Sequence, residues 1–140
     1  MKLATIRTTD GTAAVRVDTD VAVELGAADL GDFLSRSDWR QAAENADGRR
    51  HSVADLDYAP VVVRPEKVFC VGLNYRTHIL EMGRDLPEHP TLFAKFARAL
   101  VGAHDPVVLP ASSEQGDWEA ELGVVSGNEV RHATREQAAA

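Results

Sequence analysis

Residues 117–122 read Asp-Trp-Glu-Ala-Glu-Leu, a stretch in which acidic and apolar side chains alternate. This alternation predicts a β-strand, because successive side chains of a strand point to opposite faces. Glu119 and Glu121 would then share a face, with their backbone positions about 6–7 Å apart. Two carboxylates held so close favour a hard divalent cation between them, Mg²⁺ or Mn²⁺. The alternative is a strand with one solvated face, which is common in antiparallel sheets.

The bulk composition is that of a globular protein. The chain has 140 residues, a length sufficient for one modest domain or two small ones. Of these residues, 44% are hydrophobic and 26% are charged. The formal net charge of −7 argues against a general nucleic-acid binder, which needs a basic surface. Neither a signal-peptide pattern nor a run of about 18 apolar residues occurs. We therefore expect a cytoplasmic protein with no nucleic-acid or membrane partner.

The first part of the chain, residues 1–65, predicts a small α/β domain that ends near Pro65. Asp38 is expected to cap its second helix, with Gln41 completing a capping box and Gly48 ending the helix. Residues 48–51 are expected to form a loop. The predicted strands are Leu3–Arg7, Ala13–Val17 and Val21–Leu25, and the predicted helices are Leu30–Leu34 and Trp39–Ala46.

The second part, residues 66–140, predicts several strands around one short helix. The helix is expected at Tyr75–Met82, with Asn74 as its N-cap and Gly83 at its end. Thr134, with Gln137 three residues later, is a helix-start signature near the end of the chain. The predicted strands are Lys67–Val71, Thr91–Phe96, Val107–Leu109 and the acidic stretch 117–122.

His78 and Glu81 lie three residues apart on the predicted helix, so their side chains share a face. A carboxylate beside a histidine orients the ring and raises its basicity, as general-base chemistry requires. The alternative is an exposed ion pair of little energetic consequence. Lys95 has two similar interpretations, because it could blunt the edge of a sheet or stabilise a substrate enolate or carboxylate.

The remaining reactive side chains predict no further site. Cys70 lies in an apolar run and is expected to be a buried small hydrophobe, since nothing nearby would lower its pKa. No pair among the other histidines has metal-ligand spacing, so we expect surface residues at His51, His89, His104 and His132.

Several blocks from residue 66 onward, taken in order, resemble the fumarylacetoacetate hydrolase superfamily. The likeness is to its bacterial members of the 2-hydroxyhepta-2,4-diene-1,7-dioate isomerase or acylpyruvate hydrolase kind. Residues 1–65 look like the small N-terminal domain of many bacterial members. The matching blocks are Lys67–Tyr75, His78, Glu81–Gly83, Pro90–Lys95, Gly102, Asp105–Pro110 and Asp117–Leu122.

The resemblance implies a role for each candidate residue. Glu119 and Glu121 would be two of three carboxylate ligands of Mg²⁺ or Mn²⁺. His78 and Glu81 would form a dyad that activates water, and Lys95 would lie near the substrate. The substrate would be a small 2-oxo acid, such as an acylpyruvate, and the metal would stabilise the enolate formed as a C–C bond breaks or a double bond migrates.

The resemblance also implies an α+β fold in which a small N-terminal domain precedes the start of a mixed β-roll. The family's third metal ligand is an aspartate further along, so we expect residues 1–140 to be truncated and to lack useful activity alone. A full-length form would be a homodimer. The alternative is a non-catalytic remnant, or one part that needs a separate C-terminal half.

Overall fold

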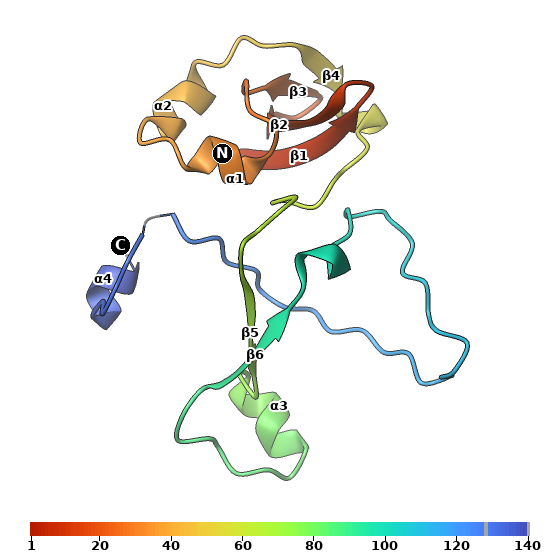
Figure 1. The fold of residues 1–140 in the computed structure, drawn as a ribbon, viewed down its shortest axis with the longest axis vertical. Helices are drawn as coiled ribbons and strands as arrows, with labels where there is room; N and C mark the ends of the chain where they lie inside the picture. Colours follow the sequence, from red (N-terminus) through yellow and green to blue (C-terminus); the bar gives the residue numbers. More distant parts are fainter. Residues whose placement is uncertain (128, 140) are drawn as a thin grey trace.

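The computed structural model describes residues 1–127 and 129–139 and begins with a four-stranded antiparallel sheet (Figure 1). The β1–β2 hairpin has the register Thr8↔Gly11, and Gly11 has a φ of 130°, which glycine adopts without steric cost. The strands lie in the order β1 (Lys2–Thr8), β2 (Gly11–Val17), β3 (Val21–Glu24) and β4 (Arg50–Ser52).

Both faces of this sheet are covered, because alternate residues of its strands pack in opposite directions. On one face Ala14 packs with Leu30 and Phe33 of α1 (Leu30–Leu34) and with Ala43 of α2 (Trp39–Glu44). On the other face Ile6, Val15 and Ala22 pack against Val53, Leu56 and Tyr58, in and after the short helix η1 (Val53–Asp55). Burying Phe33 alone contributes about 2–3 kcal/mol.

The predicted elements of residues 1–47 are confirmed, but details of the caps and of the next strand are wrong. Asp38 makes no capping hydrogen bond, because its carboxylate accepts from Arg36 at 3.1 and 3.2 Å. The side-chain cap of α1 is Asp29, which accepts from the Asp32 amide at 2.9 Å. Residues 50–52 form β4 instead of a loop, since β3 offers them an open edge to pair with.

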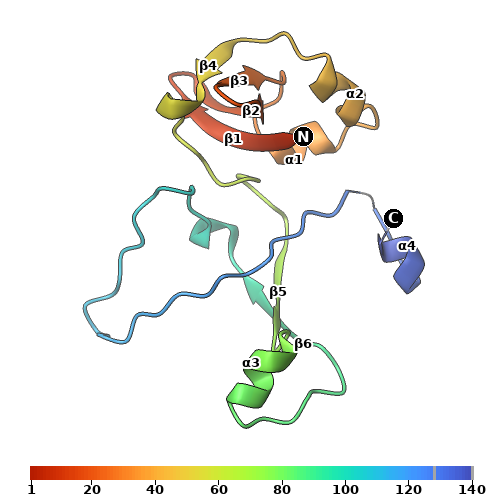
Figure 2. The ribbon, with the colours of Figure 1, turned by 180° about the vertical axis from the view of Figure 1, so that it is seen from behind.

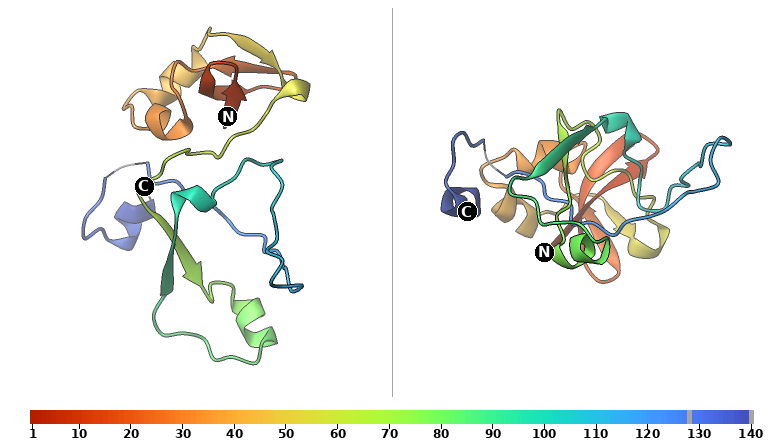
Figure 3. Two further views of the ribbon diagram at one scale, coloured as in Figure 1. Left: turned by 45° about the vertical axis from the view of Figure 1, so that its right-hand side comes forward. Right: turned by 90° about the horizontal axis from the view of Figure 1, so that it is seen from below.

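The second part of the chain is a hairpin with long extensions. Its strands β5 (Val68–Gly72) and β6 (Thr91–Lys95) form a separate two-stranded sheet, and α3 (Arg76–Glu81) lies between them in sequence. The short helices η2 (Ala97–Ala99) and α4 (Arg135–Ala139) follow. Figures 2 and 3 show this hairpin extending away from the β1–β4 sheet and its two helices.

Two predicted strands are absent from the described residues, and one predicted cap is wrong. Neither 107–109 nor 117–122 is paired with another strand, and a strand forms only where its N–H and C=O groups find a partner. Asn74 does not cap α3, whose N-cap is Tyr75 without a side-chain hydrogen bond. The helix start at Thr134 is confirmed, because Thr134 and Gln137 exchange hydrogen bonds at 2.9 and 3.3 Å.

Apolar side chains remain exposed over much of the second part. Val108 is 87% exposed and Trp118 is 83% exposed, whereas Ile79 of α3 is buried. Cys70 is half-buried instead of buried. Among the described residues, no helix is long and apolar enough to cross a membrane.

Candidate functional site

The turn before α3 is held in a strained backbone conformation. Leu73 has a φ of 52°, in the left-handed region that bulky residues rarely adopt. Strained residues of this kind concentrate at functional sites, because only a rigid surrounding maintains them. Helix α3 ends in a Schellman motif, in which Gly83 (φ 67°) donates to the Leu80 carbonyl and Arg84 donates to the Ile79 carbonyl. The predicted stop at Gly83 is therefore confirmed.

His78 and Glu81 both lie on α3, with exposed side chains. Their spacing places them on neighbouring positions of the helix surface. No hydrogen bond or ion pair joins these two side chains in the structure, so the contact expected of the dyad is not made between them. Buried Ile79 fixes the opposite side of the helix.

Lys95 lies at the end of β6, opposite Val68 of β5. Its ammonium group is 5.5 Å from the centroid of the Phe93 ring, a cation–π distance. Within the described sheet, β6 pairs only with β5, so Lys95 is also a residue of an edge strand. Both interpretations of this lysine remain compatible with its position.

Glu121 lines a groove of about 1510 Å³ that also contains Asn74 and Tyr75, the two residues before α3. Cys70 and Lys67 lie in the same groove. One of the two predicted metal ligands and the two residues before α3 therefore line the same groove. Glu119 is exposed and does not line this groove.

The predicted metal site depends on which donor atoms the structure brings together. Carboxylate oxygens are suitable ligands for Mg²⁺ and Mn²⁺. Across residues 1–127 and 129–139, however, no group of three or more His, Cys, Asp or Glu side chains is arranged to hold a metal ion. Glu119 and Glu121 therefore supply part of a ligand set, and these residues alone do not complete one.

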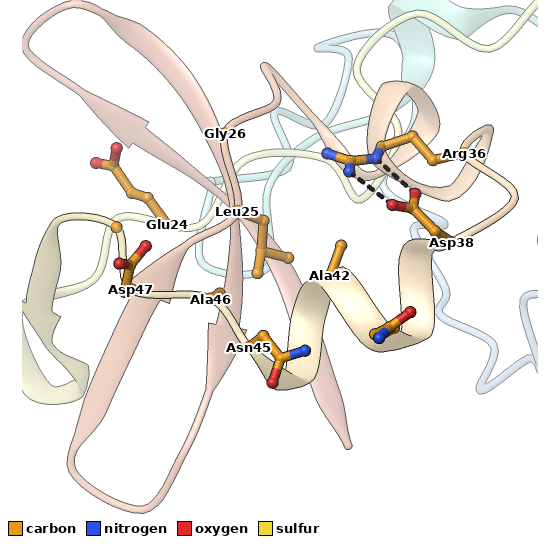
Figure 4. Close-up of a pocket in the computed structure, with 11 residues that line it drawn as sticks. Glu24, Leu25, Gly26, Arg36, Asp38, Ala42, Asn45, Ala46 and Asp47 are labelled. Carbon is orange, nitrogen blue, oxygen red and sulfur yellow. Dashed lines mark hydrogen bonds and ion pairs between the residues drawn. The ribbon is translucent and has the colours of Figure 1, made fainter.

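A second, shallower hollow lies on the N-terminal part and contains none of the predicted residues. Its volume is about 500 Å³, and its wall includes the Arg36–Asp38 ion pair, as Figure 4 shows. Glu24 lies at one side of this hollow, and its carboxylate forms a hydrogen bond with the His51 ring, with Oε1 2.7 Å from Nε2. His51 was predicted to be a surface residue of a loop, but it is half-buried on β4. The other three histidines are exposed, as predicted.

An ionic contact that no local sequence pattern predicts joins two residues 98 positions apart. The guanidinium of Arg7 on β1 donates to both carboxylate oxygens of Asp105 and to Asp57. The Arg7 hydrogen bonds, followed by one from the Gly102 amide, lower the pKa of Asp105. The hydrogen bonds to Asp105 and then to Asp57 raise the pKa of Arg7. No local pattern signals this pair, since each partner is an ordinary charged residue in its own segment.

Comparison with known proteins places the second part of the chain in a defined group. A family model described as "Fumarylacetoacetate (FAA) hydrolase C-terminal" matches residues 67–140. The human mitochondrial oxaloacetate tautomerase FAHD2A is 44% identical over 79 residues, which are 56% of this chain and 25% of that protein. A Sphingomonas 2,4-didehydro-3-deoxy-L-rhamnonate hydrolase is 43% identical over 72 residues, covering 51% of this chain and 25% of the relative.

A solved structure extends the likeness to the fold. The 5-carboxymethyl-2-hydroxymuconate delta-isomerase from Mycobacterium smegmatis superposes with a TM-score of 0.59 at 28% identity. The match covers 81% of this chain and 40% of the isomerase. This agreement confirms the predicted mixture of strands and helices. The matched region spans about a quarter of the curated relatives and two-fifths of the solved structure.

Proposed function

Because this chain belongs to the fumarylacetoacetate hydrolase family, as its sequence blocks predicted, we propose that it forms part of an enzyme acting on small 2-oxo acids. The observation that carries the proposal is the family match over 67–140, which includes all five candidate site residues. The reactions named for relatives are a tautomerisation, a hydrolysis and an isomerisation. The tautomerisation and the isomerisation move a proton next to a carbonyl group, and the hydrolysis adds a water molecule that a base deprotonates, so one general base can serve all three.

In this proposal His78 is the general base, and Glu81 orients its ring and holds the positive charge that the imidazole gains. Exposure of both side chains on α3 supports this assignment, because a base has to reach water or the substrate carbon. Lys95 binds the substrate carboxylate through its ammonium group. Its place on the β5–β6 hairpin puts it on the same short stretch of chain as α3.

We further propose that Glu119 and Glu121 are two ligands of Mg²⁺ or Mn²⁺, with the remaining ligands outside residues 1–127 and 129–139. When bound, the cation would supply Lewis-acid stabilisation of negative charge on the substrate oxygens. The position of Glu121 in the groove with Asn74 and Tyr75 supports a metal near α3. The working enzyme is proposed to be a homodimer.

A substrate panel on a full-length form that contains residues 1–140 tests the proposal. Oxaloacetate tautomerisation, oxaloacetate decarboxylation and acylpyruvate cleavage are measured with Mg²⁺ and with Mn²⁺. His78→Ala and Glu81→Ala are each expected to lower kcat by about 10²-fold, and the double variant to be little worse, because the pair acts as a unit. His89→Ala, at an exposed loop histidine, is the matched control.

Three results would contradict the assignments. Full activity in His78→Ala would remove the general base. Losses in the double variant equal to the product of the single losses would contradict the dyad. Calorimetry with Mn²⁺ is expected to give a millimolar or weaker dissociation constant for residues 1–140, since the described residues bring together no complete ligand set. Micromolar binding that survives Glu119→Gln and Glu121→Gln would place the metal elsewhere.

A further inference from the structure

The chain returns to the N-terminal part through a tight turn at residues 102–105. The Asp105 amide donates to the Gly102 carbonyl at 3.1 Å, and the Gly102 amide donates to the Asp105 carboxylate at 2.7 Å. That carboxylate also accepts both hydrogen bonds from Arg7. The turn is therefore closed by the side chain that also contacts β1.

The backbone of the turn lies directly against the backbone at Tyr58. A Cβ atom added to Gly102 would be 1.9 Å from the Tyr58 carbonyl oxygen, a separation that no side chain tolerates. The same carbonyl accepts a hydrogen bond from Arg7 at 3.0 Å. The ring of His104 meets the ring of Tyr58 edge to face, with centroids 5.7 Å apart. Only glycine at position 102 permits this approach.

The outgoing chain is attached to the same strand. Residues 59–63 leave the N-terminal part along β1 and α1, where the Ala59 amide donates to the Thr5 carbonyl at 2.9 Å. The Val63 amide donates to Asp29 at 2.8 Å. The whole excursion from 64 to 101, with α3 and the β5–β6 hairpin, is thus anchored at both ends, as the course of the chain in Figure 1 illustrates.

We propose that Arg7 is a positioning residue that acts through Asp105, and that these two side chains with Gly102 form a latch fixing the excursion of residues 64–101 to the N-terminal sheet. A segment held at one end can swing about that end. A segment held at two nearby points keeps its elements in place, which is what a site on exposed loops and short helices needs. Through this latch, the N-terminal part would hold α3 in place.

The charges around the latch define its dependence on pH. Arg7 from β1, Asp57 from the segment after η1, and His104 and Asp105 from the turn are the ionisable groups that face one another here, with Tyr58 beside them. The Arg7 hydrogen bonds lower the pKa of Asp105, so the ionised form is present throughout the neutral range. The latch is complete above the ordinary aspartate range and is lost as the pH falls through the lowered pKa.

Amide hydrogen exchange in the full chain tests the latch at the backbone groups that it protects. In Arg7→Gln and in Asp105→Asn, the Gly102 and Asp105 amides are expected to exchange at least about tenfold faster, while β1–β2 amides away from the latch keep their rates. The double variant should add little to either single one. Arg7→Lys, which keeps the charge without the two-pronged geometry, should recover part of the protection. Arg36→Gln removes an ion pair within the N-terminal part and is the control.

Two further measurements keep the proposal open to refutation if Arg7→Gln does not fold. Gly102→Ala and Asp105→Asn leave β1 unchanged, and both should release the same two amides. In the wild-type chain, protection of Gly102 should fall on acidification, whereas Asp105→Asn should show no such step. A rise in exchange spread equally over β1 and β2, strictly additive effects of the two substitutions, or a flat pH profile in the wild type would overturn the latch.

Discussion

Substitution of Thr5 by valine removes a hydroxyl that joins three segments of the N-terminal part. Thr5 is 1% exposed, and its hydroxyl donates to the Val61 carbonyl at 2.6 Å and accepts from the Leu30 amide at 3.1 Å. Leu30 is the first residue of α1, where an amide has no partner within the helix. Thr5→Val keeps the shape of the side chain and leaves that amide buried without an acceptor.

The magnitude follows from the two groups released. The Leu30 amide, which is buried, costs about 1–3 kcal/mol when unpaired, whereas water can replace the hydroxyl at the carbonyl of exposed Val61. We expect Thr5→Val to lower the free energy of unfolding by about 2 kcal/mol. A folded unit of about 60 residues has only about 3–9 kcal/mol in total. Thr5→Ser keeps both hydrogen bonds and loses one methyl group, about 1 kcal/mol.

Urea unfolding followed by tryptophan fluorescence measures this effect. Trp39 packs partly buried against the core, whereas Trp118 is 83% exposed, so the change in signal reports the N-terminal part. With a slope of about 1 kcal/mol/M, the midpoint should fall by about 2 M in Thr5→Val. Thr12→Val, at a half-buried threonine of β2, is the control and should change little. Equal midpoints for Thr5→Val and Thr12→Val, or an unchanged exchange rate of the Leu30 amide, would refute the reasoning.

Three other perturbations have defined outcomes. Gly48→Ala would place a Cβ atom 2.4 Å from the Glu24 carbonyl oxygen, so its thermal midpoint should fall well below that of Gly123→Ala, where a Cβ meets nothing within 4 Å. Equal midpoints for these two variants would contradict the packing at Gly48. Leu73→Gly should relieve about 1 kcal/mol of left-handed strain, in contrast to a loss of about 1 kcal/mol for Leu80→Gly within α3; a loss at both positions would argue against strain. The pKa of Asp105, measured by NMR from the chemical shift of its carboxyl carbon, should lie below the ordinary aspartate value of 3.8, and Arg7→Gln should raise that pKa. An unmoved titration in Arg7→Gln would remove Arg7 as the cause.

The elements of the N-terminal part could be predicted because their signals are local. The two-residue turn before Gly11 and the apolar spacing of residues 30–34 specify a hairpin and a helix without reference to distant chain. β4 could not be predicted in this way, since residues 50–52 carry a weak strand pattern and form a strand only against the open edge of β3.

The candidate site shows the same division between local and distant information. The spacing of His78 and Glu81 on a helix is a local property, and the structure contains that helix. The alternation in residues 117–122 describes faces of a strand, but whether a strand forms depends on a neighbour that no pattern within those residues supplies. The contact of Arg7 with Asp105 is equally non-local, because it depends on where two distant segments meet.

The open edges of the β5–β6 sheet have a consequence for the order of events during synthesis. The β1–β2 hairpin and its helices need only the first 60 or so residues to emerge from the ribosome before their core can close, since domains fold from the N-terminus as they appear. In the described part of the chain, the hairpin that follows has no partner strand at either of its two edges, and Phe69 and Leu92 are exposed. Such edges recruit other strands. The stage of synthesis at which neighbouring nascent copies could exchange strands is therefore the one at which β6 has left the ribosome.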